Sequence, residues 1–302
     1  MTYPSTHPLC ATKYMRKMRG GSQSSLIQAE DGNYYIVKLM GNPQGTQVLL
    51  NEALGSEIMD LIGLETAKWN PIWISPEFIK NNPTLWFETV DSGHRPPPAG
   101  VHFGSKLILP NANENLYEIL PRNWCARIRN RESFVGMLLF DLWANQSDNR
   151  QAIFLQHQGN RFIKATFIDH GCLFGPNQAN ETAARIRAMY VDPAVYGNID
   201  LDALLPKWEA RIQTLDETTL RLLIGHLHIP SEWYTPRDIN RIVAGLAERR
   251  ALLGKYADLI RATLNCLRVD TLVEQPDDVQ ICGDQLCAHG YRRIRRAMSR
   301  VG

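Results

Sequence analysis

The chain has 302 residues, too many for one small core and few for three domains, which predicts one or two lobes. Apolar residues make up 44% and charged residues 21%, as in ordinary globular proteins. The net charge of +2 gives no overall field that would favour nucleic acid or a membrane as partner. Neither a signal-peptide pattern nor an apolar run of about 18 residues is present, so we expect a cytoplasmic protein without a membrane span.

The N-terminal part predicts a hairpin. Residues 1–12 contain two prolines and little pattern, so we expect a loose arm there. Two β-rich runs follow, over 24–29 and 34–40, and they flank a turn at Asp31-Gly32. Short β-rich runs on either side of such a turn are a strong hairpin signal.

One helix and two more strands are predicted next. Apolar residues recur at helical spacing over 49–61, and Gly63 is placed to end that helix. Strands are expected over 69–74 and 85–90. The segment 91–98 ends in three consecutive prolines, which cannot continue a helix or a central strand, so it is expected to be a loop.

Longer helical patterns begin after about residue 110. The segment 132–144 is apolar on most sides, which predicts a buried helix. A polar stretch, 145–151, separates it from a second hairpin over 152–156 and 161–168. This hairpin therefore lies between two loops that contain aspartates.

The rest of the chain is expected to be mainly helical. Thr235, Pro236 and Asp238 form a helix start signal, and the helical pattern runs toward Leu264. The aromatic pair Trp233-Tyr234 is expected to pack between helices. The predicted fold is therefore α+β and two-lobed, with a small β-rich N-lobe over 1–107 and a larger, mainly helical C-lobe over 108–302.

A glycine-rich turn precedes the first predicted strand. Its sequence is Gly20-Gly21-Ser22-Gln23-Ser24, followed by Ser25. Glycines with small hydroxyl residues can direct several backbone N–H groups at one anion. By itself this is a weak signal, and the turn is not a Walker A motif, because no Gly-Lys-Ser/Thr follows.

Lys38 lies inside an apolar predicted strand. A lysine there must face solvent or have an anionic partner, since burying it unpaired is unfavourable. Glu52 and Glu57 lie on the following predicted helix, and a strand lysine held by a helix glutamate can point its ammonium group at phosphates. Glu52 is the first choice of partner and Glu57 the reserve.

Asp148 and Asp169 lie in loops at the two ends of the second predicted hairpin. Phosphoryl transfer needs one carboxylate to orient the attacking hydroxyl and another to hold Mg²⁺ across the phosphates. Each loop aspartate alone is more often a turn or cap residue. The glycine-rich turn, lysine, glutamate and two aspartates nevertheless occur in the order found in kinases. His170, beside Asp169, is expected to pack or hydrogen-bond.

These motifs give the chain a resemblance to a known family. Over roughly residues 15–200 it resembles the HipA-like kinase domain family, which is distantly similar to the phosphatidylinositol kinases and the HipA toxin kinase. The motifs that carry the resemblance are Gly20-Gly-Ser-Gln-Ser, Val37-Lys38, Asn51-Glu52, Gly100-Val-His-Phe-Gly-Ser105, Phe140-Asp-Leu-Trp with Asp148, and Phe167-Ile-Asp-His-Gly171.

The resemblance implies a protein-kinase-like fold and an ATP- and Mg²⁺-dependent kinase. Residues Gly20 to Ser25 would lie at the phosphates, and Lys38 on the α- and β-phosphates. Asp148 would be the catalytic aspartate and Asp169 the Mg²⁺ ligand. Ser105 would lie near the nucleotide or the hinge. The acceptor would be a hydroxyl, on a protein Ser/Thr or on a small molecule.

The chain departs from the kinase pattern at the second metal ligand. Most kinases have an asparagine five residues after the catalytic aspartate, where this chain has Ile153. Gln151 could replace it, although glutamine is a longer and poorer ligand for Mg²⁺.

Two alternatives to an active kinase stay open. One is a catalytically weak pseudokinase, a nucleotide-binding interaction module. The other, less favoured, is a nucleic-acid-binding regulator that uses the arginines of 122–131 and of the C-terminus.

Overall fold

The structure is a computed structural model that describes residues 7–18, 21–89, 93–109, 111–175, 190 and 193–273. They divide into two compact units. The first unit comprises the described residues up to Leu109 together with Ile168–Leu173 and Asp216–Ala244. The second comprises Pro110–Phe167, Phe174–Leu215 and the described residues from Gly245 onward. The lobe boundary between residues 107 and 108 stays a prediction.

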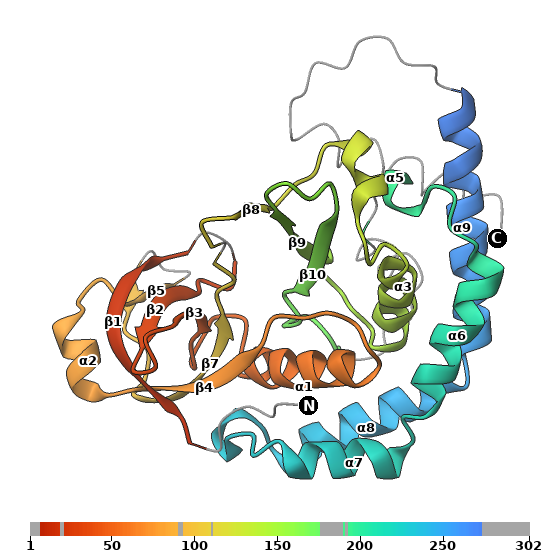
Figure 1. The fold of residues 1–302 in the computed structure, drawn as a ribbon. Coiled ribbons are helices and arrows are strands. Elements are labelled where there is room, and N and C mark those ends of the chain that lie inside the picture. Colours follow the sequence, from red (N-terminus) through yellow and green to blue (C-terminus); the bar gives the residue numbers. More distant parts are fainter. Residues whose placement is uncertain are drawn as a thin grey trace. The chain divides into compact units, whose positions relative to one another are not determined.

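The first unit is built around a closed sheet with the strand order β1-β2-β3-β7-β4 (Figure 1). The strands are β1 (Leu9–Lys17), β2 (Ser25–Ala29), β3 (Tyr34–Lys38), β4 (Trp69–Ile74) and β7 (Gly100–Lys106). Side chains such as Ile27, Tyr35 and Val37 fill the interior. Because successive strand residues point to opposite faces, Lys38 is directed away from the face that Val37 occupies.

Strand β1 shows that the expected loose arm over 1–12 is wrong for its last four residues. β1 pairs antiparallel with β2 and parallel with β4, where Leu9 lies opposite Ile72. Its side chains are half-buried or exposed along the whole strand. Leu9, Ala11 and Tyr14 are partly buried against the core, but two register shifts break the regular alternation that would mark the strand in the sequence. Residues 1–6 lie outside the described part.

The predicted helix of the N-terminal half is α1 (Gln47–Leu61), which contacts β7. It ends as predicted at Gly63, whose φ of 80° is accessible to glycine without strain. The N–H of Gly63 donates to the carbonyl of Asp60, and the N–H of Leu64 donates to that of Met59. This satisfies backbone groups that the end of a helix would otherwise leave unpaired.

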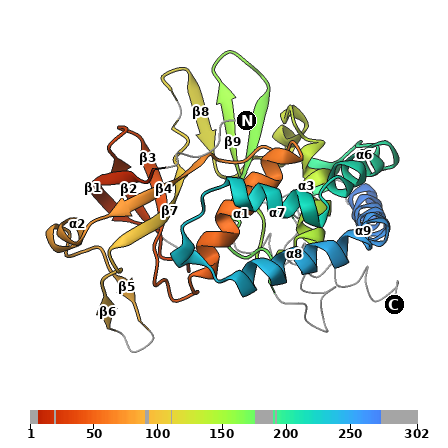
Figure 2. The same ribbon diagram turned by 90° about the horizontal axis from the view of Figure 1, so that it is seen from below.

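Two small elements lie on the same unit. The strand expected over 85–90 is limited to β5 (Phe87–Glu88), which pairs with β6 (His94–Arg95) in a short hairpin that projects from the closed sheet (Figure 2). A short helix, α2 (Pro76–Asn81), follows β4 and is capped by the hydroxyl of Ser75.

Residues from the C-terminal half complete the first unit. They form α7 (Glu217–His226), the 3₁₀ helix η2 (Ser231–Trp233) and the beginning of α8 (Pro236–Arg250). Helix α8 starts at the predicted signal, since the N–H and hydroxyl of Thr235 donate to the Asp238 carboxylate at 2.8 and 2.7 Å.

Trp233 packs mainly against strands, which corrects the expectation that it packs between helices. Its indole N–H donates to the carbonyl of Val101 in β7 at 2.8 Å. Its ring lies 6.3 Å from that of Trp69 in β4 and 6.5 Å from that of Phe103 in β7. A buried tryptophan looks the same in a sequence whichever element it meets, so its partners could not be read from local pattern.

The second unit contains a small sheet and a buried helix. The sheet has the order β10-β9-β8, with β8 (Glu114–Tyr117), β9 (Gln151–His157) and β10 (Ile163–Ile168). The buried helix is α3 (Ser133–Trp143), close to the predicted bounds, and every residue from Phe134 to Trp143 is buried. The other helices are η1 (Arg122–Arg127), α5 (Pro193–Tyr196), α6 (Leu201–Gln213) and α9 (Leu253–Val273).

Helix α3 is the centre of this unit. It contacts α5, α6 and α9, and Gly136 allows the indole of Trp208 in α6 to approach its backbone. The helical pattern predicted toward Leu264 is interrupted at residues 251–252, between α8 and α9. None of the helices in the described part of the chain has the length and apolar composition needed to cross a membrane.

Candidate active site

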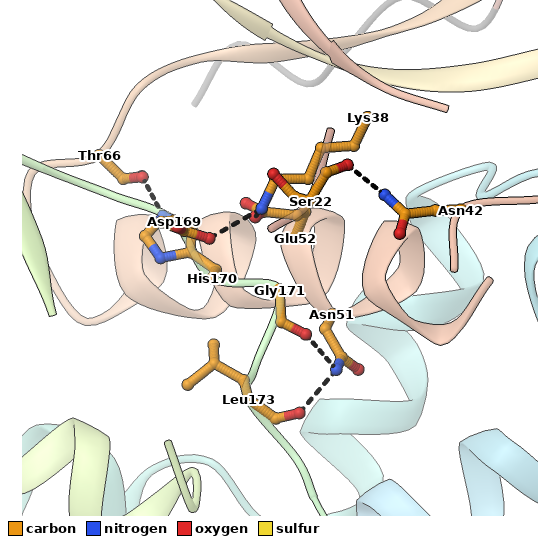
Figure 3. A network of polar contacts seen from close by, with 10 residues as sticks. All are labelled: Ser22, Lys38, Asn42, Asn51, Glu52, Thr66, Asp169, His170, Gly171 and Leu173. Carbon is orange, nitrogen blue, oxygen red and sulfur yellow. Dashed lines mark hydrogen bonds and ion pairs between the residues drawn. The ribbon is translucent and has the colours of Figure 1, made fainter. Parts of the chain in front are cut away.

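Lys38, the last residue of β3, lies between two carboxylates (Figure 3). Its ammonium group forms an ion pair with Glu52 of α1 and another, at 2.7 Å, with Asp169. The side chain is buried, and burial alone would lower its pKa. The charges of Glu52 and Asp169 outweigh that effect and raise the pKa of Lys38 above its ordinary value, so the ammonium stays charged.

The sequence left Glu52 and Glu57 as candidate partners of Lys38, and the two have different partners in the structure. Glu52 is buried and paired with the lysine. Glu57 instead accepts a hydrogen bond from the indole N–H of Trp69 at 2.8 Å. Since residues five apart on a helix face different directions, the two carboxylates cannot serve the same group.

Asp169 directly follows β10 and adopts a left-handed backbone conformation, with φ of 63°. Aspartate tolerates this conformation better than most residues. Its side chain is 31% exposed, so solvent reaches the carboxylate although Lys38 contacts it. Gly171 packs closely here, because a Cβ on it would lie 3.1 Å from the Lys38 ammonium and 3.2 Å from the Glu52 carboxylate.

The two histidines of these motifs take structural positions. Nε2 of His170 lies 2.8 Å from the hydroxyl of Thr66, and both residues are buried. His102 of β7 is also buried, and its Nδ1 accepts a hydrogen bond from the backbone N–H of Met40 at 2.8 Å. Burial lowers the pKa of His102 to about 4, so this side chain is neutral at physiological pH.

The glycine-rich turn is fixed by side chains from outside it. The side-chain amide of Asn42 donates to the carbonyl of Ser22, and Asn42 also accepts a hydrogen bond from the N–H of Gln44 at 2.8 Å. Asn42 follows the Met40-Gly41 end of the hairpin, and its role was missed from the sequence. Gly20 lies outside the described residues, and Gly21 is exposed.

Gln23 and Ser24 have different positions in this turn. Gln23 has a φ of 47°. Its side-chain oxygen accepts hydrogen bonds from the Lys17 ammonium and from the backbone N–H of Glu88, both at 2.8 Å. Its side-chain nitrogen donates to the backbone carbonyl of Glu88 at 3.1 Å. Its side chain therefore ties the turn to β5, which leaves its backbone as the group that could meet a phosphate. Ser24 is buried, and its carbonyl accepts from the N–H of Met18.

Ser105 lies near the end of β7, opposite Ile36 of β3. Two residues earlier on β7, Phe103 lies opposite Lys38. Ser105 is thus on the strand next to Lys38, displaced along the sheet by two residues.

The second unit carries the predicted catalytic loop. Asp148 is exposed, and its carboxylate accepts a hydrogen bond from the N–H of Asn149 at 2.7 Å. Gln151 is exposed at the first position of β9, and Ile153 is half-buried within that strand. The roles of Asp148 and Gln151 stay predictions.

A buried ion pair closes this loop onto α3. The guanidinium of Arg150 meets the carboxylate of Asp141 at 2.5 Å through Nη2 and at 3.2 Å through Nε, and both side chains are almost fully buried. A bidentate arginine–carboxylate pair fixes orientation as well as distance. Asp141 and Arg150 were not predicted as site residues, although a charge within an apolar helix is the signal that could have found them.

The carboxylates are too few at any one place to form a metal site alone. Within the described ranges, no group of three or more His, Cys, Asp or Glu side chains could hold a metal ion.

The fold and the lysine–carboxylate arrangement define a phosphotransferase of the kinase-like class. The chain belongs to the HipA-like kinase family, whose model matches residues 12–244. The resemblance drawn from the motifs and the predicted kinase-like α+β fold are thereby confirmed. No match was found among curated protein sequences.

Solved structures of similar fold are also kinases. The Helicobacter pylori proinflammatory kinase CtkA is 15% identical, with a TM-score of 0.50, over 83% of this chain and 97% of that one. A crystal structure of the Golgi casein kinase is 13% identical, with a TM-score of 0.46, over 88% of this chain and 74% of that one. Another crystal structure of the Golgi casein kinase, with Mn/ADP bound, is 11% identical, with a TM-score of 0.45, over 83% of this chain and 73% of that one. The similarity to CtkA shows a kinase-like fold.

Proposed function

We propose that this kinase transfers the γ-phosphoryl group of ATP, with Mg²⁺ as the metal, to a hydroxyl acceptor on a protein Ser/Thr or a small molecule. The observation that carries the proposal is the position of Lys38, whose buried ammonium lies between Glu52 and Asp169. A buried lysine paired with a helix glutamate beside an acidic loop is the arrangement that kinases use at their phosphates.

The residues present fit a magnesium nucleotide. Asp169 offers carboxylate oxygen, the ligand type that Mg²⁺ takes, and its side chain is reached by solvent. Lys38 offers a fixed cation for phosphate oxygens, held by its ion pairs with Glu52 and Asp169. Mg²⁺-ATP would supply the phosphoryl group and neutralise charge on its oxygens.

Each residue then has a distinct task. Lys38 binds the α- and β-phosphates, and Glu52 holds the ammonium in place. Asp169 binds the metal. The backbone N–H groups of the turn from Gly20 to Ser24 bind phosphate, and Ser105 lies toward the nucleotide.

From the resemblance to kinases we also assign proposed roles to Asp148 and Gln151, which lie in the second unit. Asp148 orients the acceptor hydroxyl and accepts its proton while the new O–P bond forms and the bond to ADP breaks. Gln151 is the second metal ligand in place of the usual asparagine. We propose a cytoplasmic location for this reaction.

A pseudokinase is the second candidate, and Ile153 favours it. An apolar side chain in the strand β9 cannot bind a metal, so the site lacks the ligand that most kinases have there. In that case the chain would bind nucleotide with little turnover and act through interaction with a partner.

The test is transfer from γ-labelled ATP by the full chain with Mg²⁺ or with EDTA, followed as ADP release and as label on the protein. We expect Mg²⁺-dependent transfer that falls by at least about 100-fold in Lys38→Met, Asp148→Asn and Asp169→Asn. Lys68→Met is the matched control, because Lys68 is an exposed lysine of the same unit paired with Asp60.

The outcomes separate the two candidates. Binding of an ATP analogue without transfer by the wild-type chain supports the pseudokinase. Transfer that survives in Asp148→Asn and Asp169→Asn contradicts the assigned roles.

A further inference from the structure

One face of α1 lies against the loop that carries Asp169. Val48, Asn51, Glu52 and Gly55 are spaced by three and four residues and so share a face of the helix. All four approach the segment Asp169–Leu173.

Asn51 makes the most specific of these contacts (Figure 3). Its side-chain amide donates to the carbonyl of Gly171 at 2.8 Å and to the carbonyl of Leu173 at 2.7 Å. Its oxygen accepts from the side-chain amide of Gln47 at 3.1 Å. An asparagine amide has two N–H donors, and both are used on the loop, in a position that is 5% exposed.

The helix and the loop are also in close van der Waals contact. A Cβ on Gly55 would lie 2.5 Å from Leu173 and 2.8 Å from His170. A Cβ on Gly171 would lie 2.8 Å from Val48. A Cβ at either position would force these neighbouring side chains to shift, so glycine at both positions lets the helix and the loop pack closely.

Two further hydrogen bonds hold the loop. The carboxylate of Glu52 accepts from the backbone N–H of His170, and the imidazole of His170 meets Thr66. The left-handed conformation of Asp169 thus lies within a densely bonded segment, as expected where surrounding structure maintains an uncommon backbone geometry.

We propose that Asn51 is a positioning residue that holds the Asp169–Leu173 loop on α1, so that Asp169 is set for metal binding by the same helix that sets Lys38 through Glu52. The inference rests on the proposed role of Asp169 as metal ligand. It implies that Lys38, Glu52 and Asp169 already have the same relative positions before a nucleotide binds. The Asp169–Leu173 loop then does not have to become ordered on binding.

Asn51→Asp is the sharpest test, because it keeps the shape of the side chain and removes both donors. The new carboxylate would face two carbonyl oxygens. Asn82→Asp is the matched control, since Asn82 makes one comparable amide-to-carbonyl bond, to Phe78 at 2.8 Å, beside α2 in the same unit.

Two readouts are needed, one of them independent of catalysis. In the ligand-free protein, amide hydrogen exchange over residues 168–175 should be at least about 10-fold faster in Asn51→Asp, while strands β2 and β3 keep their wild-type protection. In kinetics, the Mg²⁺ concentration for half-maximal rate should rise by about 10- to 100-fold, as when a residue that orients a metal ligand is removed. Binding of ATP in EDTA should stay within about twofold of wild type, because Lys38 and Glu52 are retained.

The results decide the inference separately from the proposed function. If exchange of the loop is unchanged in Asn51→Asp, or if it rises equally in the strands and in Asn82→Asp, the inference is overturned even in an active enzyme. If the loop loosens and the Mg²⁺ requirement rises together, the inference is supported. A wild-type chain that transfers no phosphoryl group, yet shows the loosened loop in the variant, overturns the proposed function and keeps the positioning role.

Discussion

The carboxylate of Glu57 accepts a hydrogen bond from the indole of Trp69 at 2.8 Å, and this fixes which glutamate of α1 serves Lys38. Trp69 belongs to β4 and is buried. The bond therefore anchors one side of α1 to the closed sheet. Glu52 lies on another side of the helix and pairs with Lys38. Glu57 thus has a structural role, and Glu52 has the proposed catalytic one.

Replacing each glutamate by glutamine should separate these tasks. In Glu52→Gln the lysine loses its helix partner, and we expect the rate of phosphoryl transfer to fall by about 100-fold. In Glu57→Gln the amide oxygen still accepts from Trp69, so the rate should stay within about threefold of wild type. Initial rates of ADP release give the comparison, with circular dichroism to check folding. Equal losses in both variants would contradict the division.

Trp233 should contribute strongly to the stability of the first unit. Truncation in Trp233→Ala removes packing against Trp69 and Phe103 as well as the bond to Val101, and should lower the free energy of unfolding by about 3–5 kcal/mol. Trp233→Phe keeps much of the packing and leaves a buried carbonyl unpaired, for a loss of about 1–3 kcal/mol. Urea denaturation measures both.

Trp73→Ala is the control for this series, because Trp73 is 39% exposed on β4. The Trp73→Ala substitution should lower the free energy of unfolding by at most about 1 kcal/mol. A Trp233→Ala variant as stable as this control would show that the C-terminal segment contributes little to the first unit.

Local pattern was enough to predict the elements that carry the proposed site. The turn at Gly32, the β-rich run of β3 and the helical spacing of α1 are all short-range signals, and they give Lys38 and Glu52 their elements. The Ile-Asp-x-Gly motif likewise locates Asp169 at the end of a strand, because strand and turn chemistry are local.

Contacts between distant segments could not be predicted in this way. β1 closes the sheet by pairing with a strand some 60 residues later, and its core-facing residues Leu9, Ala11 and Tyr14 do not follow a regular alternation. Asn51 bonds to Gly171 and Leu173 across 120 and 122 residues, and nothing near an asparagine in a helix indicates such a partner. Trp233 likewise joins the first unit through contacts that depend on the assembled sheet.

The buried pair Asp141–Arg150 should be needed to position the proposed catalytic loop, whereas an apolar pair could replace its contribution to the free energy of unfolding. Asp141→Leu leaves a buried guanidinium without this carboxylate and should lower the free energy of unfolding by about 3–5 kcal/mol. The double variant Asp141→Leu/Arg150→Met replaces both charges by apolar groups, and should return to within about 2 kcal/mol of wild type.

Activity distinguishes the two roles of this pair. Because Arg150 is two residues from Asp148, the double variant should recover stability without recovering the rate of transfer. Urea denaturation and ADP release, measured on the same preparations, give the comparison. A double variant with both stability and rate near wild type would mean that the loop is positioned without the ion pair.

His102 should make the stability of the protein depend on pH. Burial lowers its pKa from an ordinary value of 6.5 to about 4. The unfolded chain therefore takes up a proton near pH 6.5, whereas the folded protein does so only near pH 4, so acid favours the unfolded state. The contribution of His102 to the free energy of unfolding is therefore complete above pH 6.5. It is lost as the pH falls toward 4, by about 3 kcal/mol in total.

His102→Asn tests this dependence, because the asparagine oxygen can still accept from the N–H of Met40 but does not titrate in this range. At pH 8 the variant should lie within about 1 kcal/mol of wild type. Between pH 6.5 and 4 the free energy of unfolding of the wild type should fall more steeply than that of the variant, until the variant is the more stable protein in acid. Parallel curves for the two proteins across this range would show that His102 takes up its proton at the same pH in the folded and unfolded states, which would contradict the lowered pKa.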